Sequence, residues 1–158
     1  MEMKILEARE ADIPLLIELN NELQELHINW DHERYKKANK KEIAEWLGKL
    51  LKNKSVKILI AFIDSEVVGY VVAKVIKREE NVFIYPSQFI EIDQIVVTEK
   101  WRNKGVGRGL IEEIKRHAKK IGINTLSLAV FARNSNAIDA YRRMGFESEG
   151  IKMTLKLK

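Results

Sequence analysis

The chain has 158 residues, of which 46% are hydrophobic and 32% are charged, and its formal net charge is +5. This composition excludes a disordered protein and suits a single folded domain over residues 1–158 with two packed layers. The absence of cysteine excludes disulfide bonds, cysteine nucleophiles and cysteine–zinc sites, and it fits a cytoplasmic location.

Local composition narrows the partners further. No apolar run approaches the roughly 18 residues of a membrane span, and the three histidines show no metal-ligand spacing, so we expect no membrane and no metal. Residues 100–158 hold 14 Lys and Arg against five Asp and Glu, whereas residues 1–99 hold 14 against 18. This uneven distribution of charge favours an anionic ligand at the basic C-terminal part of the chain. Nucleic acid is not expected as a partner, because no recognition motif accompanies the basic residues.

The first half of the chain alternates between strand and helix patterns. Asp12 before Pro14 marks a helix start, and leucines then recur at helical spacing. Two strand patterns farther on are joined by a short polar turn at residues 64–66, which predicts a hairpin. The predicted elements are a strand at 4–8, a helix from 14 to about 26, a helix at 40–51, and strands at 56–63 and 67–75.

The second half repeats a strand–helix pattern twice. Gly122 and Gly145 mark the ends of its two helices. The predicted elements are a strand at 89–97, a helix at 110–121, a strand at 126–130, a helix from 134 or 135 to 143, and a closing strand at 147–157. The whole predicts an α/β (α+β) fold, a mixed and mainly antiparallel sheet flanked by helices, in the order β-α-α-β-β-β-α-β-α-β.

A glycine-rich, basic turn at residues 102–109 is the most informative segment. Glycines let backbone N–H groups converge on an anion, and the helix that follows adds partial positive charge at its N-terminus. The turn is not a P-loop, because Lys104 precedes the glycines, and the glycine spacing does not match a dinucleotide fingerprint. From these residues alone, either phosphate binding or a tight connection without a ligand stays open.

Two separate motifs resemble the GNAT family of N-acetyltransferases. Arg102-x-x-Gly105-x-Gly107 before a helix is similar to the family's acetyl-coenzyme A signature, and residues 134–146 resemble its second recurrent segment. The predicted order of elements agrees with the family along the chain. The resemblance implies the GNAT fold and an acyltransferase that moves the acetyl group of acetyl-coenzyme A to a primary amine.

The resemblance also implies how the co-substrate acetyl-coenzyme A is bound. Amides at the helix start would hold its pyrophosphate, and the preceding strand would pair with its pantetheine arm. An N–H near Val97 would stabilise the oxyanion. Asn134 would hydrogen-bond pantetheine or fix the local turn, and simple capping of the following helix stays open for it. The implied binding residues are Ile95, Val96, Val97, Arg102, Asn103, Lys104, Gly105, Val106, Gly107, Arg108, Asn134 and Tyr141.

Catalysis by this route needs an acid and a base. The resemblance assigns Tyr141 as the acid that protonates the departing thiolate, although its helix face also fits ordinary core packing. Because a protonated amine must lose a proton before it attacks, a base is expected too. Glu91 and Asp93 lie two apart on one strand, hence on one face with Ile95 and Val97 before any bulge. We prefer Glu91, acting through a water; a solvated strand start is the alternative for both.

The acceptor is defined least. Acidic and aromatic residues near the first two helices suit a small cationic amine, of polyamine or amino-sugar type, with Trp30, Asp31 and Tyr35 as candidate contacts. Two other functions stay open: a protein N-terminal or lysine acetyltransferase, and a non-catalytic sensor that binds acetyl-coenzyme A. The resemblance is also compatible with a homodimer formed through C-terminal strands.

Overall fold

The structure is a computed structural model that describes residues 2–157; Met1 and Lys158, the end residues of the predicted domain, lie outside the described residues. The chain divides into two compact units, one ending at Leu128 and the other beginning at Ala129. The first unit contains a sheet with helices α1 (Ile13–Trp30), α2 (Lys40–Lys52) and α3 (Val106–Lys120), and the second contains helix α4 (Ser135–Arg143).

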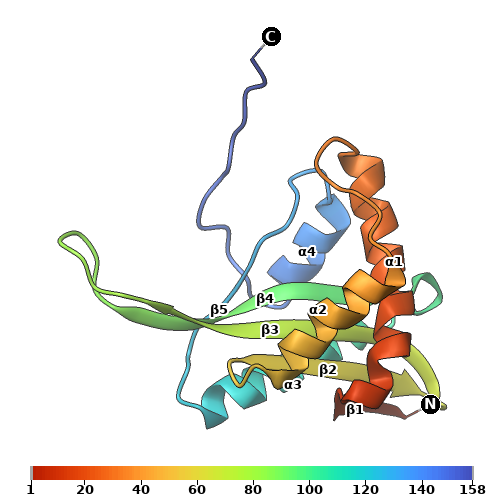
Figure 1. Ribbon diagram of the computed structural model, residues 1–158. Helices are drawn as coiled ribbons and strands as arrows, with labels where there is room; N and C mark the ends of the chain where they lie inside the picture. Colours follow the sequence, from red (N-terminus) through yellow and green to blue (C-terminus); the bar gives the residue numbers. More distant parts are fainter. Residues whose placement is uncertain (1, 158) are drawn as a thin grey trace. The chain divides into compact units, whose positions relative to one another are not determined.

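A five-stranded sheet in the order β1-β2-β3-β4-β5 forms the first unit (Figure 1). Neighbouring strands are antiparallel, except that β4 and β5 are parallel, which confirms the predicted mixed and mainly antiparallel sheet. Asp64 and Ser65 both have positive φ angles, as a tight hairpin turn between β2 and β3 requires. The strands are β1 (Met3–Glu7), β2 (Val56–Ile63), β3 (Glu66–Arg78), β4 (Ser87–Val97) and β5 (Leu126–Leu128).

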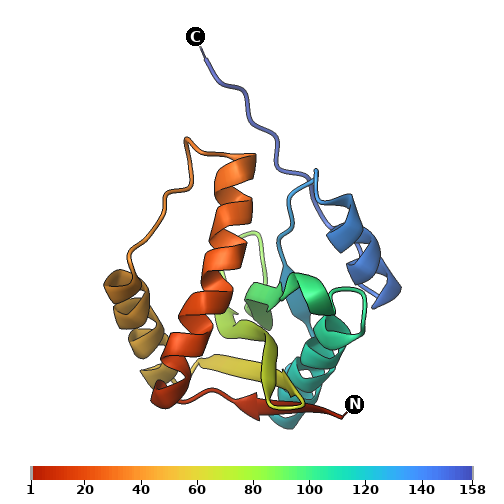
Figure 2. The same cartoon turned by 90° about the vertical axis from the view of Figure 1, so that its right-hand side faces the viewer.

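Helices cover both faces of this sheet (Figure 2). Helices α1 (Ile13–Trp30) and α2 (Lys40–Lys52) pack on one face, and α3 (Val106–Lys120) contacts β1 to β4 from the other. Side chains alternate along the strands, so that Ile60 and Tyr70 lie under α1 and α2 whereas Leu59 and Val71 are buried on the α3 side. Each fully buried aliphatic side chain stabilises the fold by roughly 1.5–3 kcal/mol.

Helix α3 begins four residues earlier than the pattern predicts. Residues 106–109 belong to the helix, because Gly105 takes a left-handed conformation with φ +87° and ends the turn there. Val106 is buried in the first turn, so the helix is anchored from its first residue. The basic turn is therefore a short loop of residues 102–105 followed directly by a helix N-terminus.

The prediction of a closing strand at residues 147–157 is wrong. These residues have no regular secondary structure. Their apolar side chains alternate as a strand pattern requires, yet they are 85–88% exposed: Ile151, Met153, Leu155 and Leu157. Alternation shows that a segment can have one apolar face, but a strand also needs a neighbour to hydrogen-bond, and the described residues provide none.

Gly69 permits the close approach of β3 and β4. A Cβ there would overlap the carbonyl oxygen of Val96, so Gly69→Ala should lower the free energy of unfolding by about 1–3 kcal/mol. Gly48 in α2 is the matched control, since a Cβ there would meet no other atom within 4 Å. Gly48→Ala should leave stability unchanged or raise it by up to about 1 kcal/mol. Urea unfolding of both variants measures the difference, and equal midpoints would contradict the packing described.

Candidate functional site

Strand β4 changes its pairing halfway along its length. It pairs with β5 only over residues 90–92. Toward β3, Asp93 is the extra residue of a β-bulge, because Ile92 and Gln94 lie opposite consecutive residues of β3. Beyond the bulge, β4 keeps β3 as a neighbour on one side and has an open edge on the other.

The bulge turns the following backbone amides toward this open edge. Ahead of it, the N–H of Ile90 donates at 3.0 Å to the segment leading into β5; beyond it, the N–H of Thr98 donates at 3.0 Å to a β3 carbonyl oxygen. Since N–H direction alternates along a strand, Ile95 and Val97 direct their N–H groups to the open edge. The N–H group of Val96 points the other way, toward β3. Of the three strand residues predicted to bind the co-substrate, Val96 is therefore the one without an N–H group at the open edge.

The first turn of α3 supplies a second group of open amides. The first intrahelical bond runs from the N–H of Gly109 to the carbonyl of Gly105 at 2.9 Å. Within residues 2–157, no protein group accepts from the N–H groups of Val106, Gly107 or Arg108, and no side chain caps the helix. Such groups carry partial positive charge at a helix N-terminus and hold anions well.

The glycines of this turn differ in their structural roles. Gly105 is required by its left-handed φ, and Asn103 has a similar conformation at φ +60°. Gly107 has no such requirement, because a Cβ there would lie 3.7 Å from Cγ2 of Val97, an ordinary contact. The protein's own packing therefore tolerates a side chain at residue 107, and its absence leaves room for a ligand against the helix amides.

Basic side chains surround the turn, and two of them already have partners. Nε of Arg102 donates to the carbonyl oxygen of Val97 at 3.1 Å, which ties the loop to the end of β4. The ammonium of Lys104 lies 5.0 Å from the ring centre of Trp101, a cation–π contact. Arg108 is exposed on the first turn of α3. Exposed cations contribute little individually to ion binding.

The two candidate bases lie on the sheet face covered by α1 and α2. Glu91 is opposite Lys74 in register, and the carboxylate of Asp93 accepts from the Lys74 ammonium at 2.9 Å. Lys74 is in phase with the β3 residues that pack under these helices. Ile95 and Val97, which the sequence placed on the same face, lie on the other one, because the bulge reverses the alternation.

A buried polar cluster that the sequence analysis missed links α1 to β4. Nδ2 of Asn20 donates to the hydroxyl of Tyr70 at 3.1 Å and to Oε1 of Gln94 at 3.2 Å. The Tyr70 hydroxyl donates to the same Oε1 at 2.7 Å. Tyr70 is fully buried, and burial raises the pKa of its phenol, so it stays a neutral donor. Losing the shared acceptor would leave two buried donors unpaired, so the cluster fixes α1 against β4 next to the bulge.

The predicted acceptor residues gather where α1 ends. Asp31 follows the last helical residue, Trp30, and its carbonyl oxygen accepts from the N–H of Tyr35 at 3.0 Å. The rings of His27 and Tyr35 have centres 4.8 Å apart. Burial, with a smaller effect of Arg34, lowers the pKa of His27. The imidazole is therefore neutral at neutral pH, and the cluster combines aromatic rings with one carboxylate.

The second unit carries the other two predicted residues. Oδ1 of Asn134 accepts from the N–H of Ala137 at 3.3 Å and caps α4, one of the roles the sequence left open for it. The ring of Tyr141 meets that of Phe146 edge-on at 5.8 Å between centres. Burial raises the pKa of the Tyr141 phenol above its ordinary value. The phenol is protonated at neutral pH, which is the form that can donate a proton.

Comparison with known proteins now decides the family. The model of the acetyltransferase (GNAT) family matches residues 16–146. The chain belongs to this family. The resemblance first based on the glycine signature and the segment at 134–146 is thereby confirmed, and this GNAT chain has the signature glycines at the first turn of α3.

Comparisons with individual proteins agree with this family assignment. The L-amino acid N-acetyltransferase of Escherichia coli (strain K12) is 32% identical over 106 residues, which is 66% of this chain and 62% of that protein. The chain thus spans less than two thirds of the length of this curated relative. A mutant of the BH1408 protein from Bacillus halodurans has a TM-score of 0.91 at 20% identity, covering 98% of this chain and 99% of the other. The protein AAC(6')-Iy, solved in complex with a coenzyme A bisubstrate analogue, has a TM-score of 0.79 at 16% identity, covering 100% of this chain and 99% of the other.

Two negative findings apply to the described residues alone. No helix among them is long and apolar enough to cross a membrane. No group of three or more His, Asp or Glu side chains within the same residues is arranged to hold a metal ion.

Gly107 provides a test that separates ligand binding from stability. Gly107→Ala fits the protein without strain and should leave stability unchanged or raise it by up to about 1 kcal/mol. The added methyl group would stand between the helix amides and a pyrophosphate, so the affinity for coenzyme A should fall by roughly tenfold or more. Isothermal titration calorimetry measures the change, with Gly48→Ala as the control. Full affinity in Gly107→Ala would show that no ligand approaches this turn closely.

Proposed function

We propose that this protein is an N-acetyltransferase that moves the acetyl group of acetyl-coenzyme A to the primary amine of a small cationic molecule. The observation that carries the proposal is the presence of two sets of open amides on consecutive segments, those of Ile95 and Val97 on β4 and those of the first turn of α3. The helix amides fit a pyrophosphate, and the strand edge fits an extended amide-containing arm. Coenzyme A has both groups in that order.

The reaction proposed is a direct transfer. The lone pair of the amine nitrogen attacks the thioester carbonyl carbon, and the carbonyl oxygen becomes an oxyanion that a β4 edge N–H stabilises. The carbon–sulfur bond then breaks, the new amide bond is kept, and the sulfur leaves as a thiolate. The ammonium group first loses one proton to a base, and the nitrogen loses a second proton after the attack. One proton reaches the thiolate from an acid, and the remaining proton goes to solvent.

Glu91 is the preferred base. The carboxylate of Asp93 already accepts from Lys74, whereas Glu91 has no ion pair within 4 Å among residues 2–157. At about 3.3 Å per residue, Glu91 lies roughly 13 Å along the strand from Ile95 and farther from Val97. A separation of this length is too long for one bridging water, so a proton would pass from the amine to the carboxylate through a chain of waters. Tyr141 is the proposed acid, supported by the family motif and by its protonated state.

The acceptor is proposed to contact the end of α1. Glu22 lies 4.0 Å from Arg102 of the basic turn, and Trp30 is eight residues farther, about 12 Å along the helix axis. Trp30, Asp31 and Tyr35 there suit an ammonium group by charge and by cation–π contact. The names of relatives support a small amine: one is an L-amino acid N-acetyltransferase, and solved neighbours are aminoglycoside acetyltransferases.

A panel of acceptors tests the activity directly. The protein is incubated with acetyl-coenzyme A and polyamines, amino-sugars, amino acids or peptides, and free thiol is measured. Mass spectrometry of the acceptor should show the gain of one acetyl group for at least one small amine. Acetylation of peptides alone would favour a protein acetyltransferase. Tight binding of acetyl-coenzyme A without thiol release for any amine would favour a sensor.

Replacing the candidate bases should change the pH–rate profile. In Glu91→Gln, only acceptor that is already deprotonated can react, so kcat/KM should fall at neutral pH and its rise should move to higher pH. Asp93→Asn should have the smaller effect. Steady-state kinetics across pH measures this, with Glu45→Gln of α2 as the control. If both site variants keep the profile of the unmodified protein, the base lies elsewhere.

Replacing the proposed acid should lower turnover without affecting donor binding. Tyr141→Phe removes only the hydroxyl, so kcat should fall by roughly 100-fold while the affinity for acetyl-coenzyme A stays the same. Because burial raises the pKa of Tyr141, the unmodified protein should show no loss of rate from this group below about pH 10. Tyr85→Phe, at an exposed position, is the control. An unchanged kcat at every pH would remove Tyr141 from the mechanism.

The remaining expectations are part of the same proposal. The two compact units together form one acetyltransferase domain, which the family match across both supports. The protein acts in the cytoplasm, where acetyl-coenzyme A is available and cysteine-free chains are common. It acts as a homodimer, which the exposed apolar side chains outside the candidate site support.

A further inference from the structure

A two-stranded arm extends from the sheet between β3 and β4 (Figure 1). The sequence predicted these strands to end at residue 75 and begin at residue 89, but they pair from Ile76 opposite Phe89 to Arg78 opposite Ser87. Pairing of β3 with β2 stops at Lys74, and β5 reaches no farther along β4 than residue 90. Both edges of the arm are therefore unpaired, a state that proteins usually avoid or cover.

The tip of the arm, residues 79–86, exposes apolar side chains from an ordered turn. Oδ1 of Asn81 accepts from the N–H groups of Phe83 and Ile84 at 2.8 and 3.1 Å, which fixes the loop. Phe83 is 92% exposed, and Val82 and Tyr85 are 90% and 87% exposed. A fixed turn that holds aromatic rings in water is typical of a contact surface. Glu79 and Glu80 precede the apolar residues and make the tip acidic.

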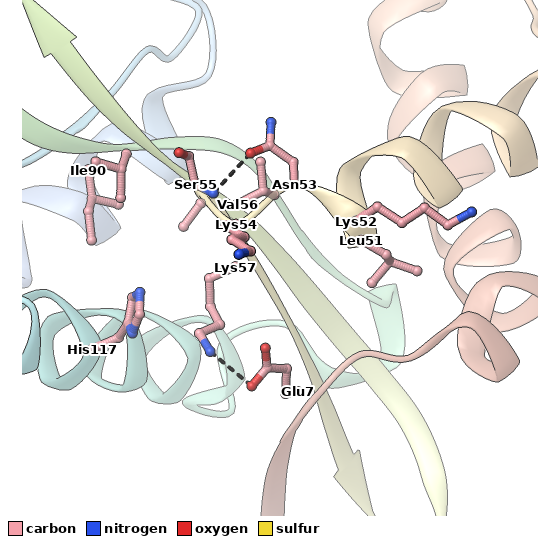
Figure 3. Close-up of a pocket in the computed structure, with 12 residues that line it drawn as sticks. Glu7, Leu51, Lys52, Asn53, Lys54, Ser55, Val56, Lys57, Ile90 and His117 are labelled. Carbon is pink, nitrogen blue, oxygen red and sulfur yellow. Dashed lines mark hydrogen bonds and ion pairs between the residues drawn. The ribbon is translucent and has the colours of Figure 1, made fainter.

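A hollow of about 250 Å³ lies at the base of the same arm (Figure 3). Its lining comes from the three central strands, the end of α2 and the segment that joins α2 to β2, and polar groups make up most of its accessible surface. Its rim is basic, with Lys52, Lys54 and Lys57, and includes the imidazole of His117 from α3. Lys57 is paired with Glu7 at 2.8 Å and Lys52 lies 3.7 Å from the Glu10 carboxylate, whereas Lys54 has no ion pair within 4 Å among the described residues. The apolar residues of the lining are Leu51, Val56, Ala73, Val75 and Ile90. Leu51 and Val56 also pack against the core under α1 and α2, and Ala73 and Ile90 are almost fully buried.

The tip and the hollow are complementary in charge and in size. One side chain of the tip fits a hollow of this volume, and Glu79 and Glu80 would meet the basic rim, where Lys54 is the lysine with no carboxylate partner among the described residues. The tip cannot reach the hollow of its own chain, because about six residues of extended arm, roughly 20 Å, separate them. In a two-fold symmetric dimer, the tip of each chain can instead reach the hollow of the other chain, since each chain has one tip and one hollow.

We propose that this arm is a homodimer contact, in which two arms lie antiparallel and the tip of each chain seats in the hollow at the base of the other arm. The interaction deepens the proposed homodimer by naming its surface, and it does not depend on the acetyltransferase activity. The contact covers the apolar tip, pairs the rim lysines with Glu79 and Glu80, and places each arm against an unpaired edge.

Cross-linking tests the contact directly, because the chain contains no cysteine of its own. Tyr85→Cys at the tip and Lys54→Cys on the rim are made in separate proteins, mixed, and treated with a short bis-maleimide. The mixture should give a covalent dimer of twice 18.4 kDa, and the Lys54→Cys protein alone should give little. Lys41→Cys, at the other end of α2, is the matched control and should give no product with Tyr85→Cys.

The second measurement is the dimerisation of variants at the tip and at the rim in solution. Phe83→Glu should weaken dimerisation by roughly thirtyfold or more in analytical ultracentrifugation. Glu79→Lys with Glu80→Lys, or Lys52→Glu with Lys54→Glu, should each weaken it by roughly tenfold or more, and the four changes together should restore it. Circular dichroism checks that each variant is folded. If Phe83→Glu is not folded, Phe83→Ala is measured in its place.

The outcomes separate the possibilities. A monomer at all concentrations would overturn both the contact and the homodimer. A dimer that is unaffected by Phe83→Glu and gives no tip-to-rim cross-link would leave the homodimer and overturn this contact, placing the interface elsewhere, for example at residues 147–157.

Discussion

The candidate site depends on the single extra residue at Asp93. Without the bulge, the alternation that begins at Ile90 would continue, and Ile95 and Val97 would direct their N–H groups into the sheet. The same residue ends the region in which β4 can pair with β5. One inserted residue therefore converts the end of a central strand into an open edge with two aligned donors, and it moves the side chains of Glu91 and Val97 to opposite faces.

The rest of the unit holds this edge beside the helix amides. Arg102 donates to the carbonyl oxygen of Val97 and approaches Glu22, so the loop is tied both to the strand end and to α1. The cluster of Asn20, Tyr70 and Gln94 fixes α1 on the other side of the bulge. The proposed anion site consists mainly of backbone groups whose positions are set by these contacts, so we expect it to be sensitive to changes in packing as well as to loss of charge.

Patterns with a local cause were predictable from the sequence. The sequence patterns predicted helices α1, α2 and α3, and the glycine spacing indicated the family. Features with a nonlocal cause were not: the bulge needs the register with β3, the Asn20 cluster joins residues 74 apart, and the arm depends on where β2 and β5 stop. The closing strand failed for the same reason, since the alternation at residues 147–157 specifies a face but no partner.

The central claim is that main-chain amides of β4 and α3 together hold one acetyl-coenzyme A. An ¹⁵N–¹H NMR titration of the full chain with coenzyme A tests it most directly, because it reports each backbone N–H separately. We expect saturable shifts that are largest at Val106, Gly107 and Arg108, with further shifts at Ile95 and Val97 and little change at Val96. Shifts confined to the lysine side of the sheet, around Lys54 and His117, or no shifts at all, would contradict it.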